Sequence, residues 1–321
     1  MDASLLDKSL IYVTGKGGVG KTTVAISLGI TAAALGRRTV VCEVADQDRV
    51  SRVFHREGVR GEGEVQLDSN LWAVTIDQRA ALEQWLGGQL RNAGLVRTLT
   101  RSHAFQYFLA AAPGAKELIT IARIWEMSQA DRWDGRSRTY DVVIVDAPAS
   151  GHGVAMLQTP QTFGDIARVG PIHRQALKIR GMLADPERTG YLGVALGEEM
   201  PVTETLELEE RLRDVVGLGL DTVVVNGVYP RRFDDAEAAR LRALAAADGH
   251  DSEAAAALEA ALAEHARATA QREHIRRLDH HTDARVLTLP FLFEPELGLD
   301  DYRRLGALLG EALSAPPRRP R

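Results

Sequence analysis

An octapeptide near the start of the chain constrains its fold more than any other feature. Residues 15–22 read Gly-Lys-Gly-Gly-Val-Gly-Lys-Thr and satisfy the pattern G-x-x-x-x-G-K-[ST]. This pattern binds phosphate when it joins a buried strand to a helix. Residues 9–14 are apolar and β-branched, as in a buried parallel strand, and residues 21–35 have helical apolar spacing that ends at Gly36. The flanks therefore predict a nucleoside-triphosphate loop.

The loop residues divide into backbone donors and side chains. The glycines let successive N–H groups point at phosphate oxygens, and the start of the following helix adds partial positive charge. We expect Lys21 to reach the β- and γ-phosphates, Thr22 to ligate Mg²⁺, and Thr23 to bond the α-phosphate. The residues expected to cradle the nucleotide through the loop backbone are Gly15, Gly17, Gly18, Val19 and Gly20.

Lys16 is a second lysine in this loop and allows two interpretations. It is either a solvated loop side chain or a cation that crosses a dimer interface to the partner's nucleotide. A cation delivered in this way stabilises charge on the transferring phosphoryl group, as an arginine finger does. The run Lys-Gly-Gly-Val-Gly-Lys-Thr-Thr favours the second interpretation, and with it a catalytic role for Lys16 beside Lys21.

Composition excludes several classes of protein. The net charge of −5 predicts no general nucleic-acid surface. The single cysteine, Cys42, excludes an intramolecular disulfide and a Cys-x-x-Cys metal site within one chain. No apolar run approaches the roughly 20 residues of a membrane span, and the first residues do not read as a signal peptide. We therefore expect a cytoplasmic chain that is not an integral membrane protein.

Strand-like runs alternate with helical stretches along the chain. Such alternation predicts an α/β fold, a mostly parallel doubly wound sheet, with ligands at the carboxyl ends of its strands. The strand-like runs are residues 9–14, 39–44, 71–76, 140–145, 191–196, 222–225 and 285–289.

The spacing of these runs predicts one domain over residues 1–314. Helical insertions at about 80–134 and 153–188 are expected to form a layer over the nucleotide face. Residues 232–281 read as a charged helical hairpin, and residues 315–321 as a disordered tail.

Asp146 closes an apolar run, residues 141–146, in the form of a Walker B element. An aspartate in this place holds Mg²⁺ directly or through water. The alternative is an ordinary strand-end aspartate that caps the next turn. The phosphate loop upstream favours the metal role.

Several motifs in order resemble the arsenite-pump and tail-anchored-protein-targeting ATPase family. The likeness covers about residues 9–313 and includes the two-lysine loop. After Asp146 it includes a Gly-His pair and Leu-Gln-Thr-Pro at residues 157–160. The remaining motifs are residues 71–77, 113–114, 204–210, 225–226 and 289–290.

The resemblance implies roles for residues outside the loop. Asn226 would read the adenine edge, Pro290 and Phe291 would line the base pocket, and Gly151 and His152 would belong to a loop that senses the γ-phosphate. Asn226 can also be a plain turn residue, and His152 a capping or surface histidine.

The first switch departs from the family pattern. An aspartate that positions the attacking water would fall on Ala45, so Asp46 is the first candidate for this role and Glu43 the second. If neither reaches the water, the chain binds ATP but hydrolyses it poorly. The departure therefore leaves open a weakly hydrolysing regulatory subunit of a heterodimer.

The resemblance implies an Mg²⁺-dependent ATPase that works as a homodimer or heterodimer and captures and releases a protein or membrane-associated client. One cysteine cannot supply the soft ligands that trivalent arsenic needs, and the zinc Cys-x-x-Cys of the eukaryotic branch is absent. A partition or division-site ATPase is the rival, because it shares the two-lysine loop. It needs a membrane helix or a basic surface that the sequence does not show.

Overall fold

A mostly parallel sheet forms the centre of the computed structural model, which describes residues 5–44, 49–55, 63–90, 102, 114–133, 135, 139–247 and 252–315. Its order in the described residues is β3-β4-β2-β5-β1-β6-β7-β8, and only β3 pairs antiparallel, with β4. The strands are β1 (Leu10–Gly15), β2 (Thr39–Glu43), β3 (Val65–Asp68), β4 (Leu71–Thr75), β5 (Val142–Asp146), β6 (Thr189–Leu196), β7 (Thr222–Val228) and β8 (Arg285–Pro290).

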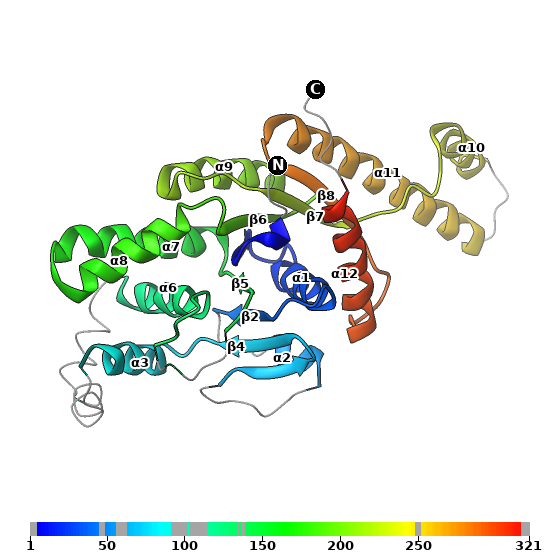
Figure 1. Ribbon diagram of the computed structural model, residues 1–321. Helices are drawn as coiled ribbons and strands as arrows, with labels where there is room; N and C mark the ends of the chain where they lie inside the picture. The colour runs from blue at the N-terminus through cyan, green and yellow to red at the C-terminus, as the bar shows by residue number, and fades with distance from the viewer. Residues whose placement is uncertain are drawn as a thin grey trace.

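Helices connect most of the parallel strands and cover both faces of the sheet (Figure 1). A short 3-10 helix, Leu5–Asp7, precedes β1. The α-helices are α1 (Lys21–Ala34), α2 (Arg49–Val53), α3 (Gln78–Leu90), α6 (Ala115–Met127), α7 (Ser150–Ala167), α8 (Gly170–Leu183), α9 (Glu199–Val216), α10 (Asp235–Ala245), α11 (Ser252–His281) and α12 (Leu299–Ser314).

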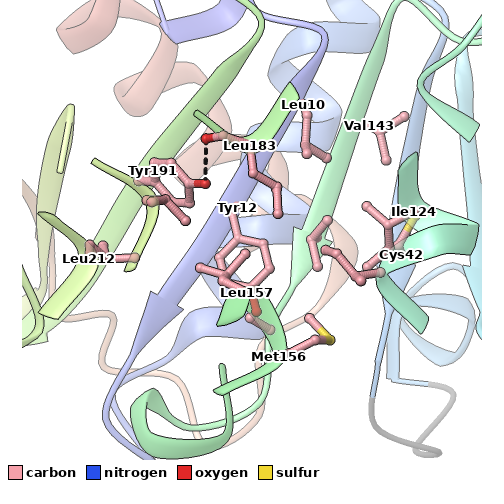
Figure 2. Close-up of a cluster of buried hydrophobic side chains, with 14 of the residues drawn as sticks. Leu10, Tyr12, Cys42, Ile124, Val143, Met156, Leu157, Leu183, Tyr191 and Leu212 are labelled. Carbon is pink, nitrogen blue, oxygen red and sulfur yellow. Dashed lines mark hydrogen bonds between the residues drawn. The ribbon is translucent and has the colours of Figure 1, made fainter. Parts of the chain in front are cut away.

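The strand β1 is buried along its whole length, and its alternate side chains enter two different cores. Leu10 and Tyr12 join the core under α6, α7, α8 and α9, where the Tyr191 hydroxyl donates to the Leu183 carbonyl at 2.9 Å (Figure 2). Ile11 and Val13 join the core under α1 and α12. Two-sided burial explains why the strand is continuously apolar rather than alternating.

The α/β fold class predicted from the sequence is confirmed. Each strand-like run overlaps a strand of the sheet, with ends that coincide or differ by up to three residues. β3 was not predicted, because it is a short antiparallel edge strand whose side chains are mostly not fully buried. Such a strand lacks the continuous apolar run on which the prediction depended.

Helices occupy much of the segments that the sequence predicted to be helical insertions and a helical hairpin. α10 and α11 pack against each other within residues 232–281 and extend to one side of the sheet, while α7 and α8 lie towards the other (Figure 1). Residues 316–321 of the expected tail lie outside the described residues. Within the described part of the chain, no helix is long and apolar enough to cross a membrane.

Candidate nucleotide-binding site

The phosphate loop begins where β1 ends, near the middle of the sheet. β1 pairs with β5 on one side and β6 on the other, so the connections run outwards in both directions from this point. Ligands of open α/β sheets bind at the carboxyl ends of strands where the strand order reverses. The sequence motif and the topology therefore place the candidate site in the same position.

Two glycines of the loop are required by close contacts as well as by backbone angle. Gly15 has φ 146°, and a Cβ there would lie 2.3 Å from the Val194 carbonyl oxygen in β6. Gly20 has φ 94°, and a Cβ there would lie 2.2 Å from Asn226 Nδ2. Real Cβ atoms do not approach other atoms so closely, and L side chains rarely adopt these angles. The neighbouring strands thus fix the curl of the loop.

Lys21 and Thr22 begin α1 and turn towards different partners. Lys21 Nζ donates to the Lys16 carbonyl at 2.9 Å, so its ammonium group lies along the loop. The Thr22 hydroxyl donates to Asp146 Oδ2 at 2.7 Å, which brings together the two side chains expected to hold Mg²⁺. Thr23 shares a hydrogen bond with Tyr302 of α12.

Burial perturbs the charged groups beside the loop. It is the main cause that lowers the pKa of Lys21 and raises the pKa of Asp146. Each group opposes the shift of the other, since Asp146 raises the pKa of Lys21 and Lys21 lowers the pKa of Asp146. A half-buried ammonium and a mostly buried carboxylate are costly to desolvate unless charges of opposite sign lie nearby.

Lys16 does not face its own loop. Its ammonium group pairs with Glu204 Oε1 at 2.6 Å, and Glu204 lies in the first turns of α9. The Lys16 side chain remains 40% exposed. The two lysines of the loop therefore have different surroundings. The ammonium group of Lys21 lies along the loop, and that of Lys16 points to α9.

Glu43 ends β2 beside Asp146 in the parallel register. Its side chain is buried, and Oε1 accepts from the backbone N–H groups of Arg49 at 2.8 Å and Val50 at 3.2 Å. The carboxylate thus caps the start of α2. Asp46 and Ala45 lie outside the described residues, and water positioning by Asp46 or Glu43 stays a prediction.

Asn226 and the residues after β8 lie on the other side of the loop. Asn226 Nδ2 donates to the Val19 carbonyl at 3.1 Å, so the amide contacts the phosphate loop. Pro290 ends β8, and the Phe291 ring stacks on Tyr229 at 4.8 Å between centroids. Phe293 packs edge-on against both rings. Adenine contacts by Asn226, Pro290 and Phe291 stay predictions.

Gly151 and His152 occupy the first turn of α7 and are exposed. The helix start is anchored on β1, because the buried Tyr12 hydroxyl donates to the Gly153 carbonyl at 3.0 Å. A Cβ at Gly17 would meet the Ala149 side chain at 4.0 Å, so the start of α7 adjoins the phosphate loop. Sensing of the γ-phosphate by Gly151 and His152 stays a prediction.

The structure brings to the site two residues that the motifs did not single out. Arg49 opens α2 next to Glu43, and its charge acts on Lys21, Asp146 and Tyr302. Tyr302 comes from α12, nearly 280 positions after Thr23. No sequence pattern marks Tyr302. Arg49 is a basic residue in an otherwise acidic stretch after β2, which is the one signal that could have revealed it.

Comparison with known proteins is consistent with this geometry. The chain matches the family model described as anion-transporting ATPase over residues 8–175, slightly more than half of its length. ATPase BagA of Mycobacterium tuberculosis is 30% identical over 237 residues, 72% of this chain and 68% of the relative. ATPase GET3 of Kluyveromyces lactis is 24% identical over 263 residues, 72% of this chain and 75% of the relative. ATPase GET3 of Podospora anserina is 28% identical over 218 residues, 66% of this chain and 60% of the relative.

Proposed function

Because the chain belongs to the anion-transporting ATPase family and is therefore an ATPase, we propose that it works as a nucleotide-gated dimer that captures and releases a client. The family inferred from the sequence motifs is confirmed by the same match. The observation that carries the dimer proposal is the direction of Lys16. Its ammonium group pairs with Glu204 rather than with its own loop, and the side chain is 40% exposed and so accessible to a second subunit. The client is a protein or a membrane-associated partner, and the expected location is the cytoplasm.

The residues present fit an Mg²⁺ site. Thr22 and Asp146 bring a hydroxyl and a carboxylate oxygen within 2.7 Å of each other, and both are the hard ligands that Mg²⁺ prefers. Mg²⁺ usually takes only one or two protein ligands and completes its shell with phosphates and water. When bound, the ion would neutralise phosphate charge. Lys21, lying along the loop, would hold the phosphates in place.

The helix α7 offers a path from the nucleotide to a client surface. Its first turn adjoins the phosphate loop, and its far end meets α8. Ile166 in the last turn of α7 and Val169 between the two helices are 72% and 80% exposed, and α8 exposes Ile172 and Leu177. Exposed large apolar side chains in one place mark interaction sites. These side chains support the client half of the proposal.

Sedimentation velocity with and without Mg²⁺ and a non-hydrolysable ATP analogue tests the dimer. We expect a monomer that dimerises only with the nucleotide. Lys16→Ala should leave ATP binding intact and lower the turnover rate by about a thousandfold, the lower end of the effect of an arginine finger. Lys116→Ala, which removes an exposed lysine on α6, is the control. A chain that stays monomeric, with normal turnover in Lys16→Ala, would refute the proposal.

One observation favours a weakly hydrolysing ATP-binding subunit as the second candidate. The Glu43 carboxylate already accepts two backbone N–H groups of α2. Glu43→Gln keeps an acceptor oxygen for the cap but removes the charge. Normal single-turnover hydrolysis in Glu43→Gln and in Asp46→Asn, each alone, would remove both residues as water-positioning groups. A large loss in one variant would identify the residue that positions the water.

The partition or division-site alternative is weakened by α12. Those of the class that bind lipid need an amphipathic helix with a free apolar face, but the apolar face of α12 is already buried. Leu305 and Leu309 pack into the core under α1, and the Thr31 hydroxyl donates to the Gly306 carbonyl at 2.6 Å. Sedimentation with anionic vesicles and ATP checks this point.

A further inference from the structure

A third cation lies beside the two lysines of the phosphate loop. Arg49 is the first residue of α2, and its backbone N–H donates to Glu43 Oε1 at 2.8 Å. Glu43 is aligned with Asp146 in the parallel pairing of β2 and β5. This chain of contacts fixes the start of α2 next to the carboxylate that bonds Thr22. The guanidinium group of Arg49 takes no part in this backbone contact.

The Arg49 charge acts on residues of three different elements. Burial is the main influence on the pKa values of Lys21 on α1, Asp146 on β5 and Tyr302 on α12, and Arg49 lowers all three. α2 packs against α1, so Arg49 at the start of α2 lies on the side of the loop where Lys21 and Thr22 begin α1. Tyr302 also shares a hydrogen bond with Thr23, so it too lies at the first turn of α1.

Two cations lie beside the start of α1. Lys21 and Arg49 are like charges that act on each other, and Arg49 lowers the pKa of Lys21. The carboxylates nearby are already engaged, since Asp146 accepts from the Thr22 hydroxyl and Glu43 accepts from the backbone N–H groups of Arg49 and Val50. Within the described residues, no carboxylate forms an ion pair with the exposed Arg49 side chain at salt-bridge distance. A polyphosphate at the loop would relieve the repulsion between the two cations.

We propose that Arg49 is a phosphate-binding residue of this ATPase, contributed by the same chain, which contacts the phosphates of ATP held by residues 15–23. A planar guanidinium suits this contact, because its fork of N–H donors matches two phosphate oxygens at once. The inference rests on the ATPase activity and does not depend on dimer formation.

Isothermal titration calorimetry of the nucleotide-free protein with Mg²⁺-ATP tests the assignment. Arg49→Gln should raise the Kd for ATP at least about tenfold, because a hydrogen bond to a charged group is lost. Arg49→Lys keeps the positive charge but loses the fork of N–H donors, so its Kd for ATP should lie between those of the wild type and Arg49→Gln. Arg52→Gln, on an exposed residue three positions later in α2, is the matched control and should bind ATP as the wild type does.

Thermal unfolding of the nucleotide-free variants separates binding from folding. The cap of α2 uses the Arg49 backbone, so Arg49→Gln should melt within about a degree of the wild type. Repeating the titration in a Lys16→Ala background separates this proposal from the dimer. The same tenfold loss there supports Arg49 whatever the oligomeric state. ATP binding by Arg49→Gln within twofold of the wild type overturns the proposal, and so does an equal loss in Arg52→Gln.

Discussion

At the scale of single residues, the site depends on positions where a side chain has no room. Gly20 illustrates this, because its backbone is left-handed and its missing Cβ leaves space for the Asn226 amide. The amide then donates to the Val19 carbonyl and holds the loop from the side of β7. One glycine therefore allows both the curl of the loop and the contact that stabilises it.

Gly20→Ala should destabilise the nucleotide-free chain by about 1 to 3 kcal/mol, since it adds backbone strain and a clash. Gly18 has a similar angle, φ 84°, but a Cβ there would meet nothing within 4 Å. Gly18→Ala should therefore lose less stability in urea unfolding. Adding Asn226→Ala to Gly20→Ala should recover part of the loss, and an unchanged loss would show that the amide is not the clashing group.

Cys42 is the only cysteine of the chain, and it is buried in β2 beneath α6. Burial raises the pKa of its thiol above the usual value, so almost no thiolate forms near neutral pH. The folded chain should therefore react only very slowly with a chromogenic disulfide at pH 8. One thiol per chain should react once guanidinium unfolds it. Fast labelling of the folded chain would contradict this picture.

At the scale of elements, a buried ion network fastens α6 to the sheet edge. Glu126 of α6 accepts from Arg132 Nε at 2.7 Å, and both side chains are 1% exposed. Arg132 also bonds Glu64 just before β3 at 2.6 Å, and the Tyr140 hydroxyl donates to the same glutamate at 2.8 Å. Buried charges are tolerated because each one has a partner of opposite sign.

Glu126→Ala should cost about 3 to 5 kcal/mol, because it removes one of the two carboxylates that pair with the buried Arg132. Glu207→Ala removes one half of an exposed pair with Arg211, at 2.9 Å, and should cost less than about 1 kcal/mol. Urea unfolding of both variants measures the difference. Equal losses would mean that burial does not determine the strength of these pairs.

The elements themselves were largely predictable from the sequence, and their ion pairs were not. Continuous apolar runs marked β1 and β5 because both strands are buried on two sides. The network around Glu126 had no such signal, because its charged residues look like solvated surface residues in the sequence. Glu64 and Arg132 are 68 positions apart, and only the packing of α6 on the sheet brings them together.

At the scale of the whole molecule, the site joins segments from both halves of the chain. The loop and its Mg²⁺ candidates could be predicted, because Thr22 and Asp146 each sit in a recognisable motif. The partner of Lys16 could not be predicted, since Glu204 lies 188 positions later and a helical glutamate has many possible roles. The sequence marked Asn226 as a candidate contact to adenine. Its hydrogen bond to the Val19 carbonyl could not be predicted, because the two residues are 207 positions apart in the chain.

If Lys16 acts on a partner subunit, its bond to Glu204 competes with dimer formation. Glu204→Gln should then tighten the nucleotide-dependent dimer by a factor of up to about five for each Lys16–Glu204 pair that assembly breaks, since a partly exposed pair is worth at most about 1 kcal/mol. Glu207→Gln, on the same helix but paired with Arg211, is the matched control. Sedimentation velocity measures both variants. A weaker dimer in Glu204→Gln would show that the glutamate assists assembly instead.

The central place of β1 has a consequence for how the chain is made. β1 is synthesised first among the strands, but its sheet neighbours β5 and β6 end at residues 146 and 196. At about 5 to 20 residues per second, the ribosome needs roughly 10 to 40 s to supply both. During much of translation, the strand that carries the nucleotide loop therefore lacks both of its neighbouring strands. We therefore expect nucleotide binding to come late in synthesis, because a nascent chain that binds ATP must already have paired β1 with β5 and β6.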